Sequence, residues 1–318
     1  MPRRAKADIE PAEAQETRAA KRRRMGTLRA SRVEAATAAR YFMHVFWFHA
    51  WCALQGYAVL DTWEQLDATC GDYLEFLWDA NQNLSVAADT LSGLQYLLEK
   101  RHGLQNSWAL LTVWRNKEPP SRAPPMPEKV ALAIAAHWAF IQQLPGPAIG
   151  VLLAFYGFLR IGEVFKLVVA DIIFAGDMKS IIVNLGQTKG GKRKGVSEFV
   201  IIDDLTTVWA TWLWTRGKQS DELIIATSAH VWRRLFAKIN ELLGISSLGL
   251  RPYSLRRGGA THFFMKTSSL AATIERGRWR HSRTAQIYLV EGALAARNTT
   301  MHPSVVSVLD ELASRWAW

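Results

Sequence analysis

Apolar and aromatic residues recur at three- and four-residue spacing between residues 30 and 116, and this spacing places them on one face of a helix. The repeats run through Tyr41, Val45, Phe48 and Trp51, then Trp63, Leu66, Tyr73, Phe76 and Leu77, and then Leu91, Leu94, Leu97 and Leu98. Asp61 and Ser85 precede two of the repeats and are expected N-caps. The pattern predicts a helical bundle over residues 30–116, with tryptophans such as Trp108 and Trp114 in its core.

Five prolines within residues 117–129 interrupt this pattern. Proline lacks a backbone N–H and has a fixed φ, so no helix or central strand is expected to run through the segment. We therefore predict a proline-rich linker at residues 117–126 and a second domain at residues 127–318.

The second domain has a mixed pattern. Helices are expected at about residues 127–142, 147–159, 204–215, 229–243, 254–266, 269–276, 282–294 and 303–316. Two short runs rich in apolar β-branched residues, 180–185 and 197–202, flank a turn of glycines and cations and predict a β-hairpin. The expected fold class is mainly α with a small antiparallel β-sheet, in which the second domain is mixed α+β.

Charge is distributed unevenly along the chain. The formal net charge is +11, and residues 1–32 carry +6, residues 33–115 carry −5 and residues 116–318 carry +10. An excess of this size favours a polyanionic partner such as nucleic acid. Residues 1–29 contain almost no large apolar residues and are predicted to be a disordered basic tail. The KRRR run at 21–24 within it is read as a solvated cluster, a nuclear address or a phosphate-binding arm.

Composition argues against several other classes of protein. Cys52 and Cys70 do not have metal-ligand spacing, so neither a disulfide framework nor a zinc site is expected. No apolar run reaches the roughly 18 residues of a membrane helix, and the N-terminus lacks the apolar stretch of a signal peptide. We expect an intracellular protein with no membrane partner, nuclear in a eukaryote and otherwise cytoplasmic with the nucleoid.

Three stretches of the second domain combine cations with glycines or with an acidic partner. Arg160 is the charge at the end of an apolar helix, and Glu163 follows one turn later, so the two are expected to pair. Residues 186–197 form a hairpin tip whose glycines and lysines suit close approach to phosphates. Arg256 and Arg257 lie near the start of a helix, where backbone N–H groups and the helix dipole attract anions.

A fourth stretch, residues 276–289, places four arginines around Trp279 and ends near Tyr288. Residues 251–283 together contain eight Lys and Arg but one acid, Glu275. Uniformly positive charge beside aromatic residues favours a nucleic-acid interface. The cations expected to contact DNA are Lys192, Arg193, Lys194, Arg257, Arg278 and Arg280.

In this order the four stretches resemble the catalytic domain of the tyrosine recombinase family, which includes phage integrases, over about residues 127–295. The family's first arginine box matches Leu159, Arg160, Glu163, Leu167 and Asp171; its hairpin lysine matches Lys189; its second box matches Tyr253-Ser254-Leu255-Arg256; and its last pair, nine residues apart, matches Trp279 and Tyr288. The helical segment before the linker resembles the family's core-binding domain.

The resemblance implies a site-specific recombinase or integrase that acts on double-stranded DNA through a 3′-phosphotyrosyl intermediate, as a homotetramer on paired sites. The implied roles are nucleophile for Tyr288, phosphate clamp for Arg160 and Arg256, general acid for Lys189 with Lys192 or Lys194 as alternatives, phosphate orientation for Trp279, and support of Arg160 for Glu163. Since the covalent intermediate conserves the bond energy, no metal, nucleotide or other cofactor is implied. The amphipathic C-terminal stretch is expected to dock on a neighbouring copy or on its own domain.

The chain departs from the family's pattern at Tyr253, where histidine is most common. A phenol, with an ordinary pKa of about 10, is a poorer proton acceptor near neutral pH than imidazole. His262 and His281 lie nearby in the sequence, but we interpret them as helix-surface residues. Two alternatives therefore stay open, a DNA-binding remnant of a mobile element that has lost the chemistry and a type IB topoisomerase.

Overall fold

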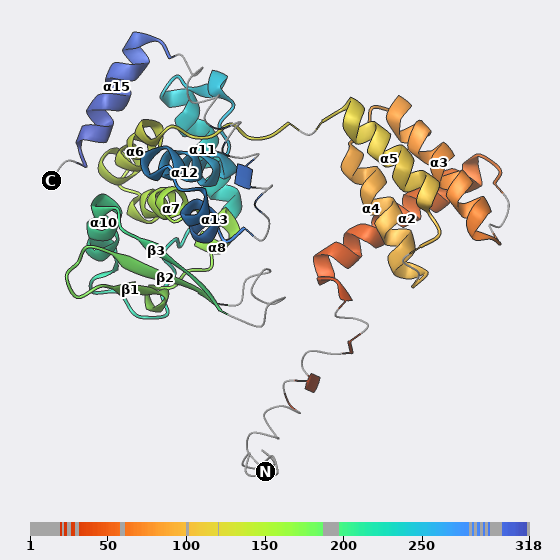
Figure 1. Ribbon diagram of the computed structural model, residues 1–318, viewed down its shortest axis with the longest axis horizontal. Helices are drawn as coiled ribbons and strands as arrows, with labels where there is room; N and C mark the ends of the chain where they lie inside the picture. Colours follow the sequence, from red (N-terminus) through yellow and green to blue (C-terminus); the bar gives the residue numbers. More distant parts are fainter. Residues whose placement is uncertain are drawn as a thin grey trace. The chain divides into compact units, whose positions relative to one another are not determined.

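The structure is a computed structural model that describes residues 20, 22–23, 27–28, 32–57, 61–99, 102–119, 121–186, 197–279, 282, 285–286, 289, 292 and 301–316. Most of the predicted tail, the hairpin tip and most of the predicted helix at 282–294 lie outside these residues. The chain divides into two compact units, Met1–Ser121 and Arg122–Trp318 (Figure 1). In the part that is described, no helix is long and apolar enough to cross a membrane.

The first unit is helical in its described part. Its helices are α2 (Ala35–Leu54), α3 (Trp63–Asp79), α4 (Leu84–Leu97) and α5 (Gln105–Lys117). They follow the predicted repeats, and Phe48 and Leu91 are among the residues that form one buried core. The predicted caps are wrong. The Thr62 hydroxyl, not Asp61, accepts a hydrogen bond from the Gln65 amide at 3.2 Å, and α4 begins earlier than Ser85.

Asp67 connects α3 to α5. Its buried carboxylate accepts hydrogen bonds from the backbone amides of Asn106 and Ser107, both at 2.9 Å, and from the Ser107 hydroxyl at 2.5 Å. The first amides of a helix have no partner within the helix and favour negative charge. The carboxylate therefore fixes the start of α5 against α3.

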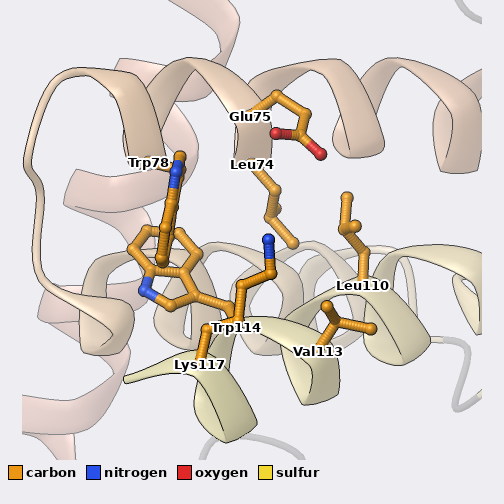
Figure 2. A pocket seen from close by; sticks show the side chains of 7 residues that line it. All are labelled: Leu74, Glu75, Trp78, Leu110, Val113, Trp114 and Lys117. Atoms are coloured by element: carbon orange, nitrogen blue, oxygen red, sulfur yellow. The ribbon is translucent and has the colours of Figure 1, made fainter.

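A shallow groove lies between α3 and α5 (Figure 2). It is lined by Leu74, Glu75, Trp78, Leu110, Val113, Trp114 and Lys117. The rings of Trp78 and Trp114 meet edge to face with their centroids 5.3 Å apart. Trp114 is buried as predicted, whereas Phe46 and Trp47 of α2 are exposed. The aromatic residues of this unit thus contribute to its surface as well as to its core.

The second unit packs its helices against one face of a three-stranded sheet (Figure 1). Its elements are α6 (Glu128–Ala136), a π-helical turn (His137–Ile141), α7 (Pro145–Tyr156), α8 (Ile161–Val164), a 3-10 turn (Val169–Asp171), β1 (Ile172–Phe174), β2 (Ile181–Gly186), β3 (Glu198–Ile202), α10 (Leu205–Thr215), α11 (Ala229–Leu242), a 3-10 turn (Ser246–Leu248), α12 (Pro252–Thr267), α13 (Leu270–Gly277) and α15 (Pro303–Ser314). The predicted fold class, mainly α with a small antiparallel sheet, is confirmed.

The sheet is antiparallel, with strand order β1-β2-β3. Val183 of β2 pairs with Val200 of β3, and both side chains are buried against the helices. On the opposite face Ile173, Ile182 and Ile201 lie side by side across the three strands, and Ile173 and Ile201 are about half exposed. Strands β2 and β3 confirm the predicted hairpin; β1, only three residues long, is not predicted by the sequence pattern.

Helix α15 packs on α6 within the same unit (Figure 1). The Trp316 indole donates to the Leu132 carbonyl at 3.0 Å, and the Lys129 ammonium lies 2.6 Å from the Asp310 carboxylate. The C-terminal stretch was expected to dock either on a neighbouring copy or on its own domain. In the structure it docks on its own domain.

Helix α12 is enclosed on several sides. Its residues Ser254 to Thr261 are all buried. The end of the proline-rich segment lies against it: the Met126 amide donates to the Ser254 carbonyl at 3.0 Å, and a Cβ on Gly258 would lie 2.0 Å from the Met126 carbonyl oxygen. α7 approaches as closely, because a Cβ on Gly259 would lie 1.8 Å from the Phe155 carbonyl oxygen. The two glycines therefore permit backbone contacts that no other residue allows.

Candidate active site

Arg160 lies between α7 and α8, with its side chain 48% exposed. One guanidinium nitrogen, Nη1, donates to Glu163 Oε1 at 2.6 Å, and the Arg160 backbone amide donates to Glu163 Oε2 at 2.8 Å. The predicted Arg160–Glu163 pair is therefore confirmed. Since a guanidinium has five N–H donors, most donors of Arg160 are free of this pairing.

Arg256, on α12, is 2% exposed. Its Nη1 donates to the Phe158 carbonyl, its Nη2 donates to the Gly277 carbonyl at 2.6 Å, and its Cζ lies 5.2 Å from the centre of a Trp279 ring. No carboxylate in the described part of the chain forms an ion pair with it. Burial first, and then the positive charges of Arg160 and Arg278, lower the pKa of Arg256 to about 10. It remains charged at neutral pH.

Arg278 is also buried, with its side chain 7% exposed. It donates to Glu163 Oε2 at 2.9 Å and to the Phe158 carbonyl at 3.3 Å, and it lies 3.8 Å from the Glu198 carboxylate. Burial opposes the charge of Glu163, but Arg278 and Arg160 outweigh it and hold the pKa of that carboxyl below its ordinary value. Three guanidinium groups thus lie near the Glu163 carboxylate, and a second carboxylate, Glu198, lies beside one of them, Arg278.

One of the arginines expected at the DNA interface lies inside the unit instead. Arg257 is 2% exposed and donates to the Ala123 carbonyl at 2.6 Å, so its expected DNA contact is corrected to an internal contact. Arg278 is paired as described above but also lines an open pocket with Glu198 and Trp279, and its DNA contact stays a prediction. Burying an arginine requires hydrogen-bond partners, and here they come from distant parts of the chain.

Tyr253 and Trp279 complete the described part of the site. Tyr253 lies in the first turn of α12 and is 40% exposed, and a negative charge on its phenol would raise the pKa of Arg256, which places the two side chains near each other. Trp279 packs on Gly277, where a Cβ would lie 2.2 Å from the indole. The structure thus brings Arg160, Tyr253 and Trp279 together around Arg256.

The remaining predicted site residues lie outside the described residues: Lys189, Lys192, Arg193, Lys194, Arg280 and Tyr288. The residue that follows Tyr288, Leu289, is described and is 3% exposed. It packs in one apolar cluster with Phe158 and Ala260. Leu289 therefore contacts the part of the unit that holds Phe158, whose carbonyl binds Arg256.

His262, on α12, is partly exposed, with 31% of its side chain accessible to solvent. Its Nε2 lies 3.3 Å from the Glu128 carboxylate, which also accepts a hydrogen bond from the Tyr156 hydroxyl at 2.8 Å. Burial, together with the charges of Asp204 and Glu128, raises the pKa of Tyr156. His281 lies outside the described residues.

A cationic face on α11 is a feature that the sequence analysis missed. Arg233, Arg234 and Lys238 are exposed on this helix, while Trp232 and Phe236 are buried in the core. Among the residues that the structure describes, no carboxylate forms an ion pair with these three cations. The signal in the sequence is an amphipathic helix whose exposed positions are basic. In the same described part, no group of His, Cys, Asp or Glu is arranged to hold a metal ion.

The solved structures that resemble the chain include the following two. The XerH site-specific recombinase bound to a palindromic difH substrate, in a post-cleavage complex, is 13% identical with a TM-score of 0.53, over 88% of this chain and 80% of that one. The Tn1549 transposon integrase in complex with transposon right-end DNA is 10% identical with a TM-score of 0.57, over 88% of this chain and 97% of that one. The chain has a tyrosine recombinase fold.

This fold agrees with the resemblance drawn from the motifs, which is confirmed at the level of the fold. No protein-family model matches the chain. No curated protein matches it either.

Proposed function

We propose that this protein is a site-specific DNA recombinase or integrase that cuts and rejoins strands through Tyr288. The observation that carries the proposal is Arg256, a buried guanidinium with no carboxylate partner in the described part of the site, held by two backbone carbonyls beside the half-exposed Arg160. A desolvated cation that forms no direct ion pair in the described part of the chain is a strong site for a phosphate, and arginine suits bidentate contact with one.

The reaction follows from these groups. The Tyr288 oxygen attacks the scissile phosphorus and passes its phenolic proton to water or to the Tyr253 oxygen, while Arg160 and Arg256 neutralise the charge that grows on the non-bridging oxygens. Lys189 gives a proton to the departing 5′-oxygen, which leaves a 3′-phosphotyrosyl bond and a 5′-hydroxyl. Attack by a 5′-hydroxyl on the same bond reverses the step. Trp279 orients the phosphate, and Glu163 holds Arg160.

DNA also needs a surface outside the phosphate site. The exposed cations of α11, Arg233, Arg234 and Lys238, replace the buried Arg257 in this role. Together with Arg280 and the predicted hairpin cations Lys192, Arg193 and Lys194, they form the proposed DNA-binding surface. In this proposal the first unit serves as the core-binding domain, the second unit is the catalytic domain, and four copies assemble on paired DNA sites.

An adduct assay tests the proposal. The full chain is incubated with a library of nicked duplexes, labelled at either the 5′ or the 3′ end of the cut strand, and SDS-resistant protein–DNA adducts are separated by electrophoresis. We expect an adduct that carries the 5′ label only, because the 3′ fragment leaves with its free hydroxyl. Tyr288→Phe should abolish the adduct and retain DNA binding.

The other outcomes decide against the proposal in different ways. Strong binding without any wild-type adduct supports the alternative of a DNA-binding protein that has lost the chemistry, which Tyr253 in the usual histidine position favours. An adduct that survives Tyr288→Phe places the nucleophile elsewhere. Relaxation of supercoiled DNA by single protomers, without exchange between sites, supports a topoisomerase instead.

A further inference from the structure

Phe158 has a backbone conformation that is unusual for its residue type. It lies between α7 and α8 with φ +48°, in the left-handed region, and its side chain is 1% exposed. A bulky residue seldom adopts this conformation because its Cβ is crowded there. Strained backbone of this kind persists when the surroundings hold it, and it occurs most often at functional sites.

The Phe158 carbonyl oxygen is a shared acceptor for two guanidinium groups. It accepts a hydrogen bond from Arg256 Nη1 and a second from Arg278 Nη2 at 3.3 Å. Arg256 has its other described acceptor at Gly277, and Arg278 has its own at Glu163. One backbone oxygen therefore fixes the distance between the Arg256 and Arg278 guanidinium groups. It also orients one edge of the Arg256 guanidinium.

The ring of Phe158 holds this peptide in place. It packs in a small apolar cluster with Ala260 and Leu289, and it meets the Phe263 ring edge to face with centroids 5.7 Å apart. The Arg276 guanidinium carbon lies 5.7 Å from the centre of the ring. Because the ring is enclosed, the backbone cannot relax to negative φ without removing it from the cluster.

We infer that Phe158 is a positioning residue for the proposed cleavage reaction: its buried ring holds the peptide in the left-handed conformation, and the carbonyl of that peptide aims Arg256 at the scissile phosphate. The inference rests on the proposed function. Phe158 itself touches no substrate. Its role differs from ordinary packing, because it depends on which backbone conformation the residue tolerates as well as on the volume that it fills.

Leucine and isoleucine separate these two roles. They are isomers of equal volume, so Phe158→Leu and Phe158→Ile remove similar packing. Isoleucine is β-branched and tolerates positive φ worse than leucine does. If the carbonyl positions Arg256, Phe158→Ile should form the covalent DNA adduct about 10- to 100-fold more slowly than Phe158→Leu, as expected for a small displacement of a catalytic group. The affinity for DNA should differ by less than about threefold between the two variants, because Arg256 acts mainly on the transition state.

Two further measurements decide whether Phe158 acts through Arg256. In an Arg256→Lys background the difference between the Leu and Ile variants should largely disappear, since coupled residues are not additive. In full-length protein labelled with ¹⁵N-arginine, the hydrogen-bonded Nη–H signals of Arg256, assigned by their loss in Arg256→Lys, should persist in Phe158→Leu and be lost in Phe158→Ile.

Equal cleavage rates for the two isomers, or full additivity with Arg256→Lys, would overturn the inference. So would retention of the Arg256 signals in Phe158→Ile. If the wild type forms no adduct on any duplex, the proposed function fails, and the NMR comparison alone still decides whether Phe158 positions Arg256.

Discussion

Glu163 balances the charge of the site. It accepts hydrogen bonds from both Arg160 and Arg278, and its side chain is 13% exposed. Its pKa is held below the ordinary value, so the stabilisation it contributes is fully present above the unfolded-state pKa of about 4.3 and is lost as the pH falls through the lower folded-state value.

Glu163→Gln should lower the free energy of unfolding by about 3 kcal/mol at neutral pH, because the enclosed Arg278 and the half-exposed Arg160 lose their counter-charge. The difference from wild type should shrink as the pH falls below the ordinary glutamate pKa of about 4.3, because the unfolded chain then binds a proton that the folded carboxyl still excludes. Urea denaturation at several pH values measures both. Glu311→Gln is the matched control, since its ion pair with Arg315 is exposed, and it should cost less than about 1 kcal/mol. A pH-independent difference would contradict the argument.

The residue at position 253 is expected to affect the rate of strand cleavage. Its side chain is 40% exposed, so a substitution there should disturb the fold little. Tyr253→His should accelerate adduct formation near neutral pH about tenfold or more, because imidazole, with a pKa of about 6.5, is a better proton acceptor than a phenol. Single-turnover rates over a pH series check this. A slower Tyr253→His variant would show that the phenol has a role of its own.

Local spacing predicted some residues of the site and could not predict others. Arg160 and Glu163 are three residues apart, so one turn of backbone determines their pairing. Arg257 and Arg278 were expected to contact DNA, but their carbonyl partners lie 134 and 120 residues away in the sequence. The left-handed Phe158 is likewise hidden, because phenylalanine carries no signal for positive φ.

The elements were predicted where their patterns are long. Helix α11 and the β2–β3 hairpin agree closely with the sequence analysis, because each has a regular apolar repeat. The three residues of β1 are too few to show alternation. The cap of α3 was misplaced by one residue, since Asp61 and Thr62 are both good capping residues and only the reciprocal bond with Gln65 distinguishes them.

The close contact of α12 with the proline-rich segment predicts that a larger residue at position 258 lowers the stability of the protein. Gly258→Ala places a Cβ 2.0 Å from the Met126 carbonyl oxygen, so the backbone must move apart at a cost of about 2 kcal/mol. Gly162→Ala is the control, since nothing lies within 4 Å of the added Cβ, and it should be neutral or slightly stabilising. Chemical denaturation measures both; equal stabilities for the two variants would refute the close approach.

The distribution of charge governs DNA binding by the whole protein. Residues 116–318 carry a net charge of +10, and the cationic face of α11 is exposed within them. Each phosphate that a protein neutralises adds about 0.9 to the slope of log affinity against log salt. A change in this slope therefore counts phosphate contacts, whatever the sequence of the DNA.

The triple substitution Arg233→Gln, Arg234→Gln and Lys238→Gln should lower the salt slope by about 2 to 3 if all three cations contact phosphates. Fluorescence anisotropy with a random duplex, over a range of salt concentrations, measures the slope. Lys129→Gln is the control, since that ammonium is paired with Asp310 on the surface formed by α6 and α15. An unchanged slope in the triple variant would exclude α11 from the interface.

The burial of α12 also bears on how the sequence can change with time. Eight consecutive residues, Ser254 to Thr261, have no exposed face, so almost any mutation there alters a packed contact. The outer face of α11 has no such constraint. Under random mutagenesis scored by folding alone, α12 should therefore appear as an intolerant block, whereas the exposed positions of α11 should tolerate substitution. Mutations can accumulate at those exposed positions without unfolding the protein, while the helix that holds Arg256 stays fixed.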